Sequence, residues 1–148
     1  MKTNGKPETL WELCEQVCEA IRMSPKNYTQ ETWATDARSL NEEACGTAYC
    51  RAGWMVALTS DEKDILSKYH TGSLNICISA SNMLKRAGVV DRDIDTLFSG
   101  AAVDRQCYRD GIEVPDQGTP EYAEQGVKGM REFMEKWEKQ LKETKIDD

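Results

Sequence analysis

The sequence TPEYAEQGVKGMREFMEKWEKQL, which runs from Thr119 to Leu141, decides the fold class of this chain. Its apolar residues recur at alternating spacings of four and three positions, which is the period of an amphipathic helix. These residues are Ala123, Val127, Met130, Met134, Trp137 and Leu141. Thr119 suits the cap of such a helix and Pro120 its first position, while Gly126 and Gly129 weaken its first half. We therefore expect one long C-terminal helix of about 25 residues.

Five shorter helices are predicted ahead of this one. The first carries an apolar stripe from Leu10 to Ile21, with Pro7 in its first turn and Pro25 as its stop. The second is capped by Thr47 and ends near residue 58.

The next three helices are delimited by capping residues and glycines. Residues 59–62, Thr-Ser-Asp-Glu, have the form of a capping box, and the helix that follows them ends before Gly72. Ser73 is expected to cap a fourth helix that stops at Gly88. Asp91 is expected to cap a fifth that ends at residues 99–100.

The predicted fold is mainly α-helical, a single compact domain of about five to six helices. With 148 residues and 39% apolar content, the chain is long enough for one substantial core and too short for two comfortable domains. We expect residues 1–6 and 143–148 to fray. Between residues 26 and 44 the helical period is lost, and we expect irregular or briefly extended chain. A short strand at 32–34, as part of one short strand pair, is an open alternative there.

The net charge of −7, from 26 acidic and 19 basic side chains, disfavours nucleic acid as a partner, because phosphate backbones need concentrated positive charge. No apolar stretch approaches the roughly 18 residues of a membrane span, and residues 1–4 do not open a signal peptide. A cytoplasmic protein without membrane association is expected.

Six cysteines occur, and we expect them to be reduced thiols packed as small apolar groups. They are Cys14, Cys18, Cys45, Cys50, Cys77 and Cys107. No C-x2-C pair exists and His70 is the only histidine, so no metal or cofactor is expected, although a site assembled from distant cysteines stays open. Cys50 in a first helical turn would have an activated thiol, but no base is in evidence, and we predict no enzymatic activity.

A ligand site is suggested by residues 45–54, CGTAYCRAGW. A helix that starts at Gly46 and Thr47 would direct unpaired backbone N–H groups at the preceding turn, and such a helix start can hold an anion. The segment also concentrates more chemically distinctive side chains than a helix start requires: Cys45, Arg51 and Trp54 complete the candidate set.

A second candidate segment extends from residue 101 to residue 118, where no period is convincing and an irregular connection is expected. It holds Arg105, Tyr108 and Arg109, which together could stack on a ring and pair with a phosphate or carboxylate. The leading hypothesis is that this segment and the Thr47 helix start close on a small anionic, nucleotide-like ligand.

Other interpretations remain open. Gly46 and Thr47 would serve a turn and a cap without any ligand, and the two arginines could simply neutralise Asp104 and Asp110. The C-terminal helix could instead present an apolar stripe to a host protein or to a second copy. That stripe comprises Met130, Phe133, Met134 and Trp137. A cysteine-dependent enzyme or a cysteine metal site is the third possibility.

The run C-G-T-x-x-C-x-A-G-W at residues 45–54 resembles the signature of a family of small, largely uncharacterised proteins from bacteriophages and some bacteria. The resemblance extends over about residues 33–140 through a helix ending at Gly88, the pair Leu97-Phe98 and a C-terminal helix. Tyr49 and Arg51 stand at variable positions of the signature. The resemblance implies a phage or prophage origin and leaves the chemistry open. By analogy with other small phage proteins, a non-catalytic protein that antagonises a process of the infected or lysogenic host is expected.

Overall fold

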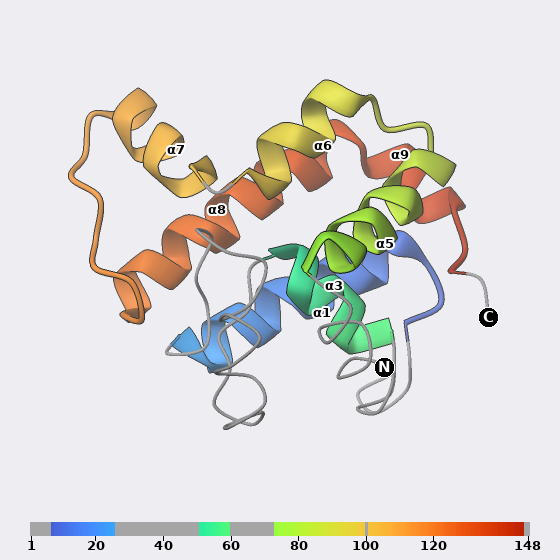
Figure 1. Ribbon diagram of the computed structural model, residues 1–148, viewed down its shortest axis with the longest axis horizontal. Coiled ribbons are helices and arrows are strands. Elements are labelled where there is room, and N and C mark those ends of the chain that lie inside the picture. Colours follow the sequence, from blue (N-terminus) through green and yellow to red (C-terminus); the bar gives the residue numbers. More distant parts are fainter. Residues whose placement is uncertain (1–6, 26–50, 60–72, 100, 147–148) are drawn as a thin grey trace.

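The computed structural model describes residues 7–25, 51–59, 73–99 and 101–146, and within these ranges the chain is mainly helical, as predicted (Figure 1). Seven helices are described in these ranges. They are α1 (Leu10–Met23), α3 (Arg51–Thr59), α5 (Ser73–Arg86), α6 (Asp91–Phe98), α7 (Ala102–Asp110), α8 (Pro120–Lys136) and α9 (Glu138–Glu143). The described residues contain no strand, only an isolated antiparallel bridge between Thr9 and Lys145.

A single core joins the helices, with α1 packed against α8, α3 and α9. In Figure 1, α6 and α7 lie along α8, on the side away from α1. Helix α1 is capped by Thr9, whose hydroxyl accepts from the backbone N–H of Glu12 at 3.2 Å. Pro7 therefore precedes the cap, and its predicted place in the first turn is wrong. The buried face of α1 has the spacing of one helical stripe: Leu10, Leu13, Cys14, Val17, Cys18 and Ile21.

The start of α8 is as predicted, since the Thr119 hydroxyl accepts from the backbone N–H of Tyr122 at 3.2 Å and Pro120 occupies the first turn. The predicted long C-terminal helix is confirmed, but it has 17 residues instead of about 25. Helix α8 ends at Lys136, and Trp137 leaves helical geometry with φ −110° and ψ 23°. The chain then turns into α9, which packs on α1 and buries Leu141.

Helix α5 ends at Arg86, and Gly88 follows it as the predicted stop, with φ +89°, a conformation that glycine adopts without strain. At α6, Val90 is the residue before the first turn and no side chain caps the helix. Asp91 is the first helical residue and does not act as the cap that was predicted. Its charge still lies in the first turn, where the helix dipole favours a carboxylate.

Helix α7 overturns the prediction of an irregular segment from residue 101 to residue 118. It spans Ala102–Asp110 and ends at Gly111, which has φ +71°. Its buried residues do have helical spacing, but two of the four are not strongly apolar: Ala102, Val103, Gln106 and Cys107. Only residues 111–119 connect α7 to α8 without helix or strand.

The two ends of the described chain pair with each other. The backbone N–H of Leu10 donates to the Thr144 carbonyl at 2.9 Å, and the N–H of Ile146 donates to the Glu8 carbonyl at 3.0 Å. Residues 144–146, which were expected to fray, are thus tied to the start of α1.

Some predictions concern residues that the structure does not describe. The strand at 32–34, the Thr47 cap and the helix after residues 59–62 lie outside the described residues. Across the described helices, none has both the length and the apolar content that crossing a bilayer requires.

Candidate functional site

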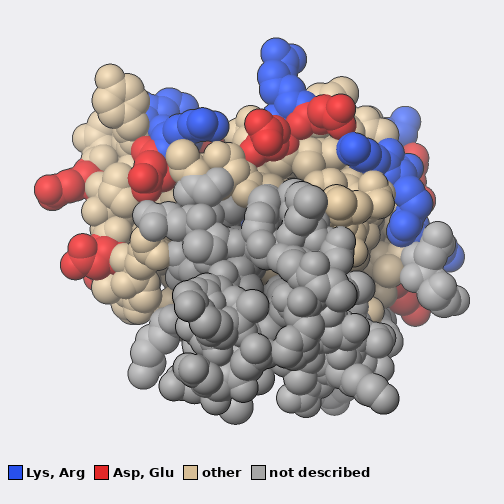
Figure 2. Space-filling model, in the orientation of Figure 1, with Lys and Arg blue, Asp and Glu red and all other residues tan. Residues whose placement is uncertain are grey.

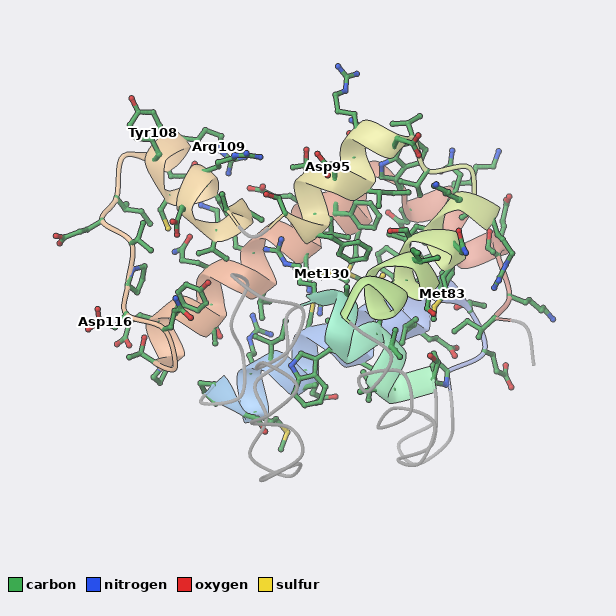
Figure 3. The ribbon with its side chains drawn as sticks, in the orientation of Figure 1. Met83, Asp95, Tyr108, Arg109, Asp116 and Met130 are labelled. Atoms are coloured by element: carbon green, nitrogen blue, oxygen red, sulfur yellow. The ribbon has the colours of Figure 1, made fainter. Side chains whose placement is uncertain are left out.

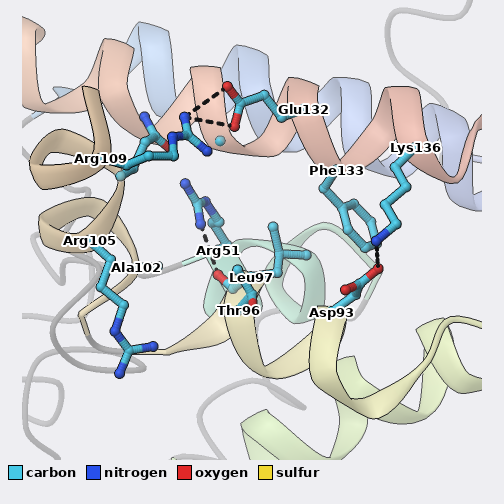
Figure 4. Close-up of a pocket in the computed structure, with 12 residues that line it drawn as sticks. Arg51, Asp93, Thr96, Leu97, Ala102, Arg105, Arg109, Glu132, Phe133 and Lys136 are labelled. Carbon is cyan, nitrogen blue, oxygen red and sulfur yellow. Dashed lines mark hydrogen bonds and ion pairs between the residues drawn. The ribbon is translucent and has the colours of Figure 1, made fainter.

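A pocket of about 380 Å³ lies between α6, α7 and α8 (Figure 4). Each of the three helices contributes residues spaced three and four apart, so each presents one face to the pocket. From α8 these residues are Gly129, Glu132, Phe133 and Lys136, and from α7 they are Ala102, Arg105, Gln106 and Arg109. Helix α6 adds Asp93, Thr96 and Leu97, and Arg51 reaches the pocket from α3.

Arg51 is the deepest charged group of the pocket, with 2% of its surface exposed. Its Nη1 donates to the carbonyl of Leu97 at 2.9 Å, and its Nη2 donates to the carbonyl of Gly126 at 2.9 Å. The Leu97 carbonyl lies in the last turn of α6, where carbonyls lack helical partners and carry the negative end of the dipole. The guanidinium thus connects α3 to both α6 and α8.

Gly129 makes room for this arrangement. A Cβ atom at this position would collide with Oε1 of Gln106 and with Nη2 of Arg51. Gln106 is itself fixed to α8, because its Nε2 donates to the backbone carbonyl of Gln125 at 2.8 Å and to the side-chain Oε1 of the same residue at 2.9 Å. At the glycine that weakens α8, side chains from α3 and α7 therefore lie against the helix backbone.

Arg109 lies at the rim of the pocket and is held by two carboxylates. Its Nε donates to Asp110 at 3.0 Å, and its Nη2 lies 3.1 Å and 3.3 Å from the two carboxylate oxygens of Glu132. These bonds, first to Asp110 and then to Glu132, raise the pKa of Arg109. The hydrogen bonds from Arg109 and Lys128 lower the pKa of Asp110 to about 2.

A second ion pair closes the other end of the pocket (Figure 4). Asp93 accepts from Lys136 Nζ at 2.8 Å and from Trp137 Nε1 at 2.8 Å. The bond from Lys136 is the main cause of a lowered pKa at Asp93, and burial opposes it. In Figure 4 this pair and Phe133 lie at the opposite end from the three arginines.

Basic side chains outnumber acidic ones in the pocket, which reverses the charge balance of the chain. Four cationic residues line it, Arg51, Arg105, Arg109 and Lys136, against the two carboxylates of Asp93 and Glu132. Arg105 is exposed and makes no hydrogen bond or ion pair with the other described residues. The outer surface differs, because acidic and basic side chains alternate over α6 and α7 in Figure 2.

Of the predicted ligand residues, the structure brings Arg51, Arg105 and Arg109 together in this pocket. Tyr108 does not join them: it is 88% exposed, and Figure 3 shows it pointing away from the helices while Arg109 points over α8. Trp54 is half-buried and packs against the core. Cys45, Gly46 and Thr47 lie outside the described residues.

The apolar stripe that was considered for partner binding belongs to the core. Met130, Phe133 and Met134 are buried, and Trp137 is half-buried with its indole N–H on Asp93. Met130 and Met134 are therefore occupied within the core, while Phe133 also lines the pocket.

Three of the cysteine thiols belong to the described part of the chain. Cys14, Cys18 and Cys107 are free and buried, and burial raises the pKa of each thiol. A raised pKa disfavours the reactive thiolate. Among the described residues, no three His, Cys, Asp or Glu side chains are grouped in a way that could hold a metal ion.

Several lining residues escaped the sequence analysis. Gln106, Glu132 and Lys136 carry no motif, and each becomes visible only when α7 and α8 are known to face each other. The one available signal was the spacing of Arg105 and Arg109, which places both on one face of a helix. Comparison of the chain with protein-family models, curated proteins and solved structures finds no match.

Proposed function

We propose that this protein binds a small anionic ligand in the pocket between α6, α7 and α8. The observation that carries the proposal is the excess of cationic over acidic side chains in this pocket, within a chain whose net charge is −7. Among the four cationic side chains, Arg51 would attract a bound anion most strongly. Its guanidinium is buried, and water screens an interaction with a buried charge less than one at the surface.

The pocket also offers apolar surface for the rest of a ligand. Leu97, Ala102 and Phe133 line it, and a cavity of about 380 Å³ lies within the range usual for small-molecule sites. Phe133 is the aromatic side chain among these residues and would offer the ring face that Tyr108 was expected to supply. A nucleotide-like molecule, with its anionic group at the arginines and its ring near Phe133, matches this division.

We further propose that the protein acts by sequestration and not by catalysis. The resemblance of residues 45–54 to a phage signature supports a setting in an infected or lysogenic bacterium, where removal of a small anion would antagonise a host process. Binding alone suffices for this action, so no cofactor or metal takes part in it.

Isothermal titration against nucleoside mono-, di- and triphosphates and cyclic nucleotides tests the proposal. The site variant is Arg105→Gln, because Arg105 lines the pocket without bonding to other described residues and its loss should spare the fold. The matched control is Arg92→Gln, an exposed arginine of α6 outside the pocket. We expect Arg105→Gln to weaken binding at least about tenfold, the effect of one charge-assisted hydrogen bond, and the control to bind as wild type. Equal weakening in both variants, or no heat from a folded protein with any ligand, would contradict the proposal.

A further inference from the structure

Glu132 is a carboxylate between the cationic end and the aromatic part of the pocket. It lies on α8 directly before Phe133, and both residues line the pocket. In Figure 4 its carboxylate lies between the three arginines and the Phe133 ring. The anionic group of a ligand does not belong at this place, because a carboxylate repels it. An ionised carboxylate accepts hydrogen bonds and donates none, so the part of a ligand that lies here has to be a donor.

Glu132 has acceptor capacity left for such a donor. An ionised carboxylate has about four lone-pair sites. Both oxygens of Glu132 are bonded to the same atom, Nη2 of Arg109, at 3.1 Å and 3.3 Å, and a single nitrogen leaves part of this capacity unused. Glu132 makes no other hydrogen bond or ion pair with the described residues, and 44% of its side chain is exposed. It can therefore keep its bond to Arg109 and accept further hydrogen bonds from a ligand.

Arg109 is a poor partner for the anionic group of a ligand, because two carboxylates already hold it. Its Nε donates to Asp110 at 3.0 Å, and its Nη2 donates to Glu132. A ligand anion at Arg109 would have to compete with both. Arg105 lies one turn earlier on α7, lines the same pocket and makes no hydrogen bond or ion pair with the described residues. The anionic group is therefore expected at Arg105 and near the buried charge of Arg51.

We propose that Glu132 accepts hydrogen bonds from ligand hydroxyl groups and that the ligand class is ribonucleoside monophosphates. This inference rests on the proposed function and names the ligand class of the same pocket. A ribose joins the phosphate of a nucleotide to its ring, and Glu132 has the corresponding place between the arginines and Phe133 (Figure 4). The neighbouring 2′ and 3′ hydroxyls are uncharged donors that suit the two oxygens of one carboxylate. A cationic donor suits this place less well, because the guanidinium of Arg109 would repel it.

AMP, UMP and their 2′,3′-dideoxy forms are the probes. The two members of each pair share the ring and the charged phosphate and differ only in the hydroxyl groups. Titration calorimetry on the full chain measures their affinities for wild type, Glu132→Gln and the matched control Glu135→Gln. Glu135 is exposed on the same helix, loses the same charge and does not line the pocket. The readout is the ratio of affinities within a pair, because removal of a nearby negative charge strengthens the binding of both members alike.

Wild type should bind a ribonucleotide at least about tenfold more tightly than its dideoxy form, the effect of a hydrogen bond to a charged acceptor. Glu132→Gln should reduce this ratio at least about threefold, because a neutral amide is a weaker acceptor, and Glu135→Gln should keep it. Arg105→Gln should weaken both members of a pair and leave their ratio unchanged. Circular dichroism verifies that each variant is folded, and Glu132→Ala is a second substitution that should also reduce the ratio.

The results that would overturn the inference are distinct from those that would overturn the proposed function. If both members of each pair bind wild type equally, or if Glu132→Gln keeps the ratio as Glu135→Gln does, Glu132 does not bind ligand hydroxyls although the pocket binds nucleotides. If no probe binds folded wild type while inorganic phosphate or another anion does, the inference fails and the anion pocket stands. If no anion binds at all, the proposed function fails as well.

Discussion

Replacement of Gly129 by alanine should destabilise this protein, although the same change stabilises most helices. In the interior of an exposed helix, glycine to alanine typically gains about 1 kcal/mol. At Gly129 the added Cβ would meet Oε1 of Gln106 and Nη2 of Arg51, and both partners are anchored by other bonds.

The packing cost exceeds the helical gain. Inserting a methyl group into a filled site costs about 1–3 kcal/mol. If the guanidinium moves to avoid the methyl group, its 2.9 Å bond to the Gly126 carbonyl weakens, at a cost of about 1.5–3 kcal/mol for a hydrogen bond from a charged donor. We therefore expect a net loss of about 2 kcal/mol in the free energy of unfolding and a melting temperature about 4–8 °C lower.

Urea titration followed by circular dichroism measures this change. Glu135→Ala, at an exposed position of α8 outside the pocket, is the control for alanine in this helix and should be nearly neutral. In a Gln106→Ala background the penalty of Gly129→Ala should shrink, because one of the two colliding atoms is gone. A Gly129→Ala protein as stable as wild type, or more stable, would refute the close approach of Arg51 to α8.

Three other perturbations have defined outcomes. Thr119→Ala removes the cap of α8 and should lower the free energy of unfolding by about 1 kcal/mol in urea titration, so an unchanged midpoint would contradict the cap. The pKa of Asp110 is about 2 in the folded protein and ordinarily 3.8, so its contribution to stability is complete above the ordinary value and lost as the pH falls toward 2. Asp110→Asn should flatten the acid limb of a stability–pH curve, and an identical limb would speak against the bonds to Arg109 and Lys128. Thiol labelling mapped by mass spectrometry should be slow in the native protein and fast in urea at three buried cysteines: Cys14, Cys18 and Cys107. Rapid labelling of the native protein at these residues would contradict their burial.

The helices with strongly apolar stripes could be predicted from the sequence, and α7 could not. In α1 the buried positions are filled by Leu, Val, Ile and Cys, so the period is visible in the residue types. In α7 a glutamine and an alanine fill two of the four buried positions, and the glutamine is accommodated by hydrogen bonds to Gln125. Burial of a polar side chain satisfied by a distant segment leaves no local signal.

The break at Trp137 was hidden for a different reason. The spacing Met134, Trp137, Leu141 continues across it, and neither glycine nor proline marks it. Tertiary contacts determine where α8 ends. The indole N–H of Trp137 donates to Asp93 on α6, and Leu141 is buried where α9 packs on α1.

Three residues that the sequence singled out line the pocket: Arg105 and Arg109 as cationic side chains in an acidic chain, and Arg51 as part of the segment 45–54. The partner helix was not foreseen, because the contribution of α8 depends on Gly129 and on the face that Glu132 and Lys136 present. From helix propensity alone, a glycine predicts a less stable helix. Its role in packing can be recognised only when the neighbouring side chains are known.

The pairing of residues 8–10 with residues 144–146 means that the order of the helices along the chain can be rearranged without changing their packing. A short glycine-serine linker would join the two paired ends, and new termini could be opened in the exposed stretch 112–114. Such a circular permutant would separate α7 from α8 in sequence while leaving the pocket between them assembled from the two ends of a new chain.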